Sequence, residues 1–130
     1  MSQTNELEIM ERIALDLEHV EESLASSFNT GAEDFNALIR PLSAAGGKRL
    51  RAQLCLLIAN AGTSIERQRI KIAEAVEMLH LATLIHDDVL DQAEIRRGED
   101  TIHMHKGNKV AILSGDYLFA KAFPIVSETP

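Results

Sequence analysis

Three aspartates lie close together in the segment HDDVLDQAEIRRG. Asp87 and Asp91 are four residues apart, so on a helix they point the same way, about one turn apart. Like charges at this spacing repel, which favours a bound cation, and oxygen ligands suit a hard cation such as magnesium. Magnesium often binds through one or two carboxylates plus substrate phosphates. Asp87 and Asp91, with Asp88 between them, are therefore a candidate magnesium site; the alternative is a solvated acidic helix end.

Two groups of basic residues could bind the phosphates. Arg96 and Arg97 follow the acidic segment, and Lys48 and Arg51 follow the pair Gly46-Gly47. We expect Lys48 and Arg51 to share one face at the start of a helix, where free backbone N–H groups and basic side chains bind anions. GGKRLR lacks the spacing of a P-loop, and a basic helix end that only extends into solvent is the alternative.

His80 lies seven residues before Asp87, two helical turns back on the same stripe. This alignment makes it a candidate ligand contact, although a helical histidine is often structural. Glu77 and His80 also form an E-x-x-H pair, which is one half of a di-iron site in four-helix proteins. No second E-x-x-H occurs in the chain, so the di-iron interpretation is not favoured.

The hydrophobic periodicity predicts a series of helices that would position these residues. The expected segments are Glu6–Phe28, a shorter helix around Pro41, Lys48–Asn60, Ile65 to beyond Asp91, and Asn108–Phe123. The stretch Gln92–Gly107 is polar and is expected to be a loop. The last helix is apolar on nearly every side, which suits the centre of a bundle, and Pro124 is expected to end it.

The composition limits the class of protein. The 130 residues carry 13 Lys and Arg against 20 Asp and Glu, a formal net charge of −7. We therefore expect no nucleic-acid partner, and any anionic ligand needs a local basic cluster. Aromatic residues make up only 4% of a chain with many helix-forming residues, so the sequence predicts an all-α fold.

The location is expected to be cytoplasmic. The single cysteine, Cys55, lies in the apolar run LCLLIA, where it cannot form an intramolecular disulfide and suits a reducing compartment. The N-terminus has no basic segment followed by an apolar one, and no apolar run approaches about 18 residues. We therefore expect neither an export signal nor an integral membrane segment.

Three segments, in this order and spacing, resemble the N-terminal part of the trans-isoprenyl diphosphate synthases, the polyprenyl synthetase family. They are GGKRLR, EMLHLATLIHDDVLDQAEIRRG and GNKVAILSGDYLFAKAF. DDVLD is similar to the first aspartate-rich motif, DDxxD, of that family. The resemblance covers roughly Leu38–Phe123 and implies a large all-α bundle around a deep cavity, usually dimeric.

The resemblance implies a role for each candidate residue. Asp87 and Asp91 look like ligands of the magnesium ions that hold the allylic diphosphate, with Asp88 in support. Arg96 is similar to the arginine that contacts the allylic diphosphate. The remaining residues resemble the contacts of isopentenyl diphosphate: Lys48, Arg51, His80 and Arg97. The implied activity is a magnesium-dependent condensation of isopentenyl diphosphate with an allylic diphosphate, which gives a polyprenyl diphosphate.

The sequence departs from the family in two places. Ala52 stands where the family usually has Pro after GGKRLR. The chain also ends at Pro130 without the second aspartate-rich motif of the family. We therefore expect residues 1–130 to be the N-terminal part of a polyprenyl synthetase domain, inactive alone, that forms a homodimer or associates with the missing C-terminal half. A small or regulatory subunit of a heteromeric synthase, or a helical interaction module without a ligand, are the alternatives.

The product length is the last expectation. Thr83 and Ala82, four and five residues before Asp87, are small. In the family, a bulky aromatic residue in this neighbourhood acts as a floor that stops synthesis at short products. Its absence implies a medium- or long-chain polyprenyl product, and Ala82→Phe is expected to shorten it.

Overall fold

The computed structural model describes residues 3–29, 33–44, 48–62, 65–96, 99–102 and 106–128. The fold is all-α, apart from one short two-stranded ladder. The elements in chain order are α1 (Gln3–Ser27), α2 (Glu33–Ala44), α3 (Leu50–Ala61), α4 (Glu66–Leu90), β1 (Ile95–Arg96), β2 (Glu99–Asp100) and α6 (Asn108–Ser127). The all-α prediction is confirmed, and the helices fall close to the segments expected from periodicity.

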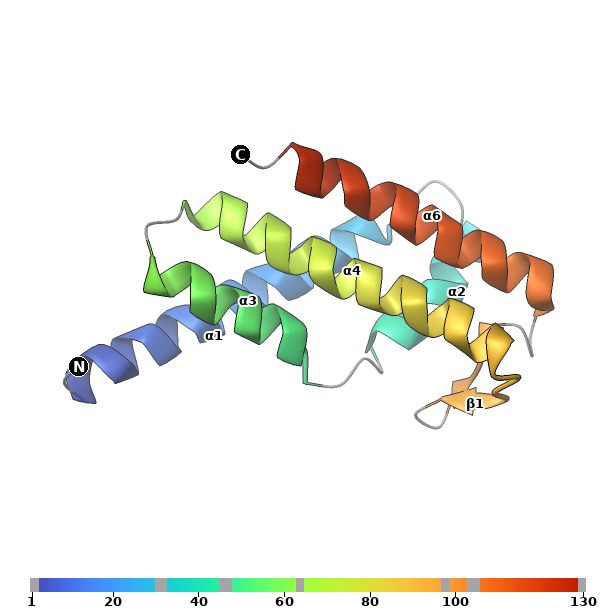
Figure 1. Cartoon of the computed structure of the whole chain (residues 1–130), viewed down its shortest axis with the longest axis horizontal. Helices are drawn as coiled ribbons and strands as arrows, with labels where there is room; N and C mark the ends of the chain where they lie inside the picture. Colours follow the sequence, from blue (N-terminus) through green and yellow to red (C-terminus); the bar gives the residue numbers. More distant parts are fainter. Residues whose placement is uncertain are drawn as a thin grey trace.

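Helix α4 is the central element of the structure. It packs against α1, α3 and α6, and Figure 1 shows α3 beside its first half and α6 along its length. Apolar and small residues at spacings of three and four face these neighbours, among them Met78, Leu81 and Ile85. They join Phe28 of the α1 end and Leu56 of α3 in one hydrophobic core. This burial fixes the orientation of α4 and of the residues it carries.

Buried polar contacts hold α1 against α4. Asp16 accepts two hydrogen bonds from the Arg69 guanidinium, at 2.7 and 3.1 Å. The pKa of Arg69 is raised, first by this hydrogen bond with Asp16. Glu74, which is completely buried, accepts hydrogen bonds from the hydroxyls of Ser23 and Ser27, each at 2.5 Å. A buried carboxylate requires such partners, so these contacts fix the register of the two long helices.

Helix α6 differs from its prediction in position and in length. Its small residues, including Ser114 and Gly115, are buried against α4, but its other side exposes large apolar residues such as Leu113 and Phe123. In the described part of the chain it therefore lies at an edge of the bundle and not at its centre (Figure 1). Pro124 lies inside the helix, which continues to Ser127, and the carbonyl of Pro124 accepts a hydrogen bond from the N–H of Glu128 at 3.0 Å.

Among the described residues, α6 alone is long and apolar enough to cross a membrane, and by length and composition only. This exceeds the expectation that no segment would approach that limit. One such helix is weak evidence for a membrane span, because core helices pass the same test. The packing of α6 along α4 gives it a place in the bundle.

The segment after α4 was expected to be a loop and contains the short ladder. β1 and β2 are antiparallel, with Ile95 opposite Asp100. Thr101 anchors the ladder, because its N–H donates to the carbonyl of Glu94 at 2.9 Å and its hydroxyl to the carbonyl of Ala93 at 2.8 Å. Since Thr101 is buried, the ladder is held close to the C-terminal end of α4, as Figure 1 also shows.

Candidate functional site

Three carboxylates form what we call the acidic end of α4: Asp87, Asp88 and Asp91. The helix ends at Leu90 and does not continue beyond Asp91 as expected, but Asp91 is its C-cap with helical φ and ψ angles. The N–H of Asp91 donates to the carbonyl of Asp87 at 2.8 Å. The two residues are therefore one turn apart, and both are exposed, whereas Asp88 is buried.

The helix termination fixes the position of Asp91. Gln92 follows it with φ 54°, a left-handed conformation that is uncommon for a residue other than glycine. The N–H of Gln92 donates to the carbonyl of Val89 at 3.3 Å, and the N–H of Ala93 donates to that of Asp88 at 2.9 Å. This pair of bonds is a Schellman motif, which turns the chain away immediately after the acidic end.

The electrostatics of the acidic end favour a cation. The C-terminus of a helix carries a partial negative charge, so carboxylates there are repelled. The last turn of α4 contains no basic residue that would offset this repulsion. The described residues contain no group of three His, Cys, Asp or Glu side chains that could hold a metal ion by themselves. Exposed carboxylates one turn apart suit magnesium, which keeps waters and takes further oxygens from phosphates.

The two arginines after the acidic end are only partly described. The backbone of Arg96 lies in β1, opposite Glu99. Arg97 lies outside the described residues, so its predicted role stays a prediction. The ladder starts five residues beyond the C-terminus of α4, which keeps the backbone of Arg96 in the neighbourhood of the acidic end.

Lys48 and Arg51 form what we call the basic start of α3. The expectation that both share one face of the helix is wrong, because α3 begins at Leu50 and Lys48 precedes its N-cap. The N-cap, Arg49, has φ 54° and ψ 42°, so the chain reverses between Lys48 and the helix. The side-chain amide of Gln53 donates to the carbonyl of Lys48. Both basic side chains are exposed.

His80 is half-buried on α4, one turn after Glu77, which contacts the first turn of α3. Glu77 connects the two helices, because its Oε1 accepts a hydrogen bond from the N–H of Ala52 at 3.0 Å. The first turn of α3 is thereby placed against this part of α4. His80 and Asp87 are seven residues apart, about 10 Å along the helix axis. The structure therefore separates His80 from the acidic end by about two helical turns, and the contact of Glu77 with α3 lies one turn further away.

Sequence reasoning missed the roles of Glu77 and Arg49. Glu77 is only 4% exposed, and its Oε2 lies 3.7 Å from an Arg49 guanidinium nitrogen. Arg49 also donates to the carboxylate of Glu21 on α1, at 2.5 and 3.3 Å. These contacts explain Glu77 without iron. Its position, buried next to a helix start, cannot be recognised from the E-x-x-H spacing.

The two residues proposed to control product length differ in exposure. Thr83 is exposed on the face that also carries His80 and Asp87. Ala82 is completely buried in the hydrophobic core. Thr83 therefore faces the side where the acidic end lies, whereas Ala82 does not, and the expected effect of Ala82→Phe on the product loses its structural basis.

Known proteins resemble this chain in sequence and in structure. Solanesyl diphosphate synthase 1, chloroplastic, from Arabidopsis thaliana is 36% identical over 120 residues, which are 88% of this chain and 30% of that protein. Heptaprenyl diphosphate synthase component 2 from Geobacillus stearothermophilus is 40% identical over 114 residues, 87% of this chain and 35% of that protein. The chain thus spans about a third of the length of these relatives.

The fold has close neighbours among crystal structures. The polyprenyl synthase from Caulobacter crescentus, complexed with calcium and isoprenyl diphosphate, superposes with a TM-score of 0.85 at 36% identity, over 92% of this chain and 37% of that one. The sequence profile of the family described as polyprenyl synthetase matches residues 32–130, a range that contains the acidic end of α4 and the basic start of α3. The chain therefore belongs to the polyprenyl synthetase family.

Proposed function

We propose that the chain is the N-terminal part of a magnesium-dependent prenyltransferase that condenses isopentenyl diphosphate with an allylic diphosphate. One observation carries this proposal: α4 bears an acidic end and, about 10 Å earlier, His80, one turn from Glu77, which binds the first turn of the basic α3 start. Two diphosphates that must react with each other need two adjacent binding places of this kind.

The acidic end of α4 would take the allylic diphosphate. Asp87 and Asp91 would hold magnesium, which when bound neutralises the charge of the departing diphosphate. Asp88 supports them from within the packed helix end. Arg96 would add a bidentate contact to the same phosphates, since its guanidinium matches their geometry.

The basic start of α3 would take isopentenyl diphosphate. Lys48 and Arg51 supply positive charge at a helix N-terminus, where free backbone N–H groups also favour an anion. His80 adds a hydrogen-bond donor from α4, and Arg97 a further guanidinium. These side chains would hold the diphosphate of the second substrate.

The reaction balances with these two substrates alone. The allylic carbon–oxygen bond breaks, and pyrophosphate leaves with the electron pair. The π electrons of isopentenyl diphosphate form a bond to the allylic carbon, and transfer of a proton to the departed pyrophosphate gives a new double bond in a chain five carbons longer. Apolar walls around the reacting carbons would exclude water, which would otherwise trap the cation.

The length of the chain bears on its partners. Because it spans about a third of its relatives, we propose that a second aspartate-rich motif completes the site from a longer chain or from a partner, in a cytoplasmic homodimer or heteromer. The relative named component 2 of heptaprenyl diphosphate synthase favours keeping a heteromer as the second candidate. Small Thr83 on the exposed face of α4 supports a medium- or long-chain product.

Condensation by the catalytically complete protein tests this proposal. Asp87→Ala should reduce the rate about a thousandfold, equivalent to about 4 kcal/mol of lost transition-state stabilisation, with little change in folding. Glu128→Ala is the matched control, because Glu128 is also an exposed carboxylate at a helix C-cap. Normal turnover by Asp87→Ala at saturating magnesium would contradict the assignment. An unchanged melting temperature of the chain with magnesium plus pyrophosphate would favour the interaction module instead.

A further inference from the structure

Glu77 is a buried carboxylate that the proposed reaction does not use. It lies in the middle of α4 and is 4% exposed. A buried carboxylate is costly unless hydrogen bonds and an opposite charge compensate it. Glu77 has both, and both come from the start of α3: the N–H of Ala52 at 3.0 Å and the guanidinium of Arg49 at 3.7 Å.

The start of α3 has no side-chain cap of its own. Its N-cap residue, Arg49, makes no capping hydrogen bond with its side chain, although the first N–H groups of a helix need partners from outside the helix. Glu77 supplies one such partner across the α3–α4 contact. Its negative charge also suits the partial positive charge of a helix N-terminus. The carboxylate of another helix thus performs the capping role.

Arg49 holds a backbone conformation that side chains disfavour. Its φ of 54° and ψ of 42° are left-handed, which costs about 1–2 kcal/mol for a residue with a Cβ atom. Its side chain is mostly buried between Glu21 of α1 and Glu77 of α4. The left-handed conformation of Arg49 sets the direction in which the chain enters α3 from Lys48. Strained residues of this kind persist where the surroundings hold them in place.

We propose that Glu77 and Arg49 are positioning residues, which fix Lys48 and Arg51 relative to His80. Arg51 is the residue directly before Ala52, and Lys48 is the residue directly before Arg49, so each contact lies next to one basic residue. Glu77 and His80 are one turn apart on α4. The inference rests on the proposed function, since it assumes that this basic set binds isopentenyl diphosphate. A misplacement of about 1 Å in such a set costs much of its binding or rate.

Amide hydrogen exchange tests the contact in the 130-residue chain. Glu77→Ala should expose the N–H of Ala52 to exchange at least about tenfold faster, whereas Glu77→Gln, which keeps an acceptor oxygen, should retain much of the protection. Glu74→Ala is the matched control, because Glu74 is also buried, one turn earlier, but binds serines of α1. Exchange at Ala52 that responds equally to both alanine variants would overturn the inference.

The Michaelis constants of the catalytically complete protein test the positioning. Glu77→Ala should raise the KM for isopentenyl diphosphate about tenfold and change that for the allylic substrate less than about twofold. Glu74→Ala should leave their ratio unchanged. Arg49→Gly, which allows the left-handed backbone but removes the anchor, should raise the same KM.

The outcomes separate the two proposals. A wild-type protein that is complete and folded but does not condense the substrates would refute the proposed function, while the exchange result would still decide whether Glu77 caps α3. An active protein in which Glu77→Ala and Arg49→Gly leave the KM for isopentenyl diphosphate unchanged would refute the positioning role alone.

Discussion

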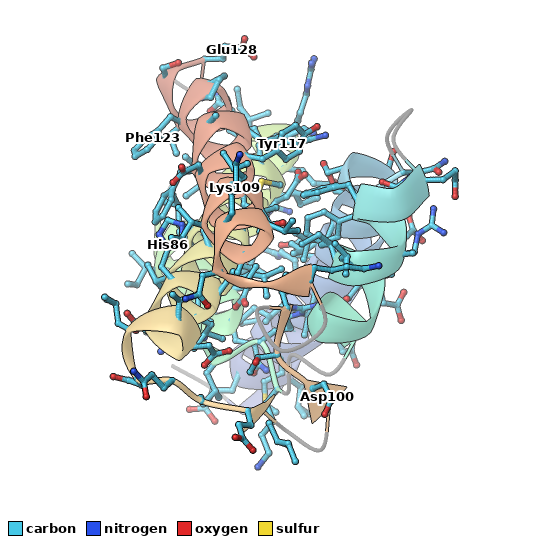
Figure 2. The ribbon with its side chains drawn as sticks, turned by 90° about the vertical axis from the view of Figure 1, so that its right-hand side faces the viewer. His86, Asp100, Lys109, Tyr117, Phe123 and Glu128 are labelled. Atoms are coloured by element: carbon cyan, nitrogen blue, oxygen red, sulfur yellow. The ribbon has the colours of Figure 1, made fainter. Side chains whose placement is uncertain are left out.

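The contact between α4 and α6 allows no side chain at Gly115. A Cβ atom added there would lie 2.2 Å from Nε2 and 2.4 Å from Cδ2 of His86. Moving the His86 ring would break two polar contacts, because its Nε2 lies 3.0 Å from the carbonyl oxygen of Ile112 and 3.3 Å from the carboxylate of Asp116. Figure 2 shows His86 against α6, on the side of Phe123 and away from Tyr117.

Two opposing effects decide the result of Gly115→Ala. Alanine in place of glycine inside a helix stabilises by about 1 kcal/mol. Displacement of the His86 ring costs about 1–3 kcal/mol of overpacking and about 1 kcal/mol of hydrogen bonding. The clash outweighs the helix propensity, so we expect the free energy of unfolding to fall by about 1–3 kcal/mol. In a His86→Ala background the clash is absent, and the same change should stabilise by about 1 kcal/mol.

A double-mutant cycle of four proteins measures the coupling between Gly115 and His86: the wild type, Gly115→Ala, His86→Ala and the double variant. Each protein is unfolded in urea at the same chain concentration and followed by circular dichroism. We expect a coupling energy of about 2–4 kcal/mol between Gly115 and His86. Gly62→Ala is the control, because a Cβ atom there would meet nothing within 4 Å. A Gly115→Ala protein that is stabilised in both backgrounds would show that α6 does not approach α4 as closely as described.

Four further predictions follow from the described contacts. Thr83→Phe in the catalytically complete protein should shorten the longest product seen by chromatography, and an unchanged product would refute a role of Thr83 in product length. Ala82→Phe should instead lower the free energy of unfolding by about 1–3 kcal/mol. Asp16→Ala should lower the free energy of unfolding by about 3–5 kcal/mol in urea, since the Arg69 guanidinium stays between α1 and α4 without its carboxylate; a loss below 1 kcal/mol would contradict this. Burial raises the pKa of the Cys55 thiol, so iodoacetamide should react with it more slowly in the folded chain than in urea at the same pH, and equal rates would count against burial. The 130-residue chain alone should self-associate in light scattering, because α6 exposes apolar residues, and should not condense the substrates; a monomer with the turnover of a full-length homologue would refute both.

The helices could be predicted from sequence because their burial follows the helical period. α1 and α4 present apolar residues at spacings of three and four, and the observed bounds differ from the expected ones by only a few residues. The spacing of Asp87 and Asp91 survives although α4 ends at Leu90, since Asp91 keeps helical backbone angles. A motif of this kind depends only on local geometry.

Features that depend on contacts between helices were not predictable. The position of Lys48 outside α3 follows from the left-handed backbone of Arg49, which no propensity predicts for arginine. The burial of Glu77 and Ala82 follows from which side of α4 meets its neighbours. The helical period places residues on faces, but it does not say which face another helix will cover.

Both ends of the proposed site contain residues that destabilise the fold locally. The hydrophobic core around α4 offsets this loss of stability. Asp87 and Asp91 add negative charge at a helix end that is already negative, and Arg49 holds a disfavoured backbone conformation. Each cost of this kind is of the order of 1 kcal/mol, whereas each large apolar side chain fully buried between α4 and its neighbours, such as Met78, contributes about 1.5–3 kcal/mol. The unfavourable charge at the acidic end would be relieved when a cation and a diphosphate bind there. A helix that is rigid along its buried side can therefore present an end that is most stable with its ligand.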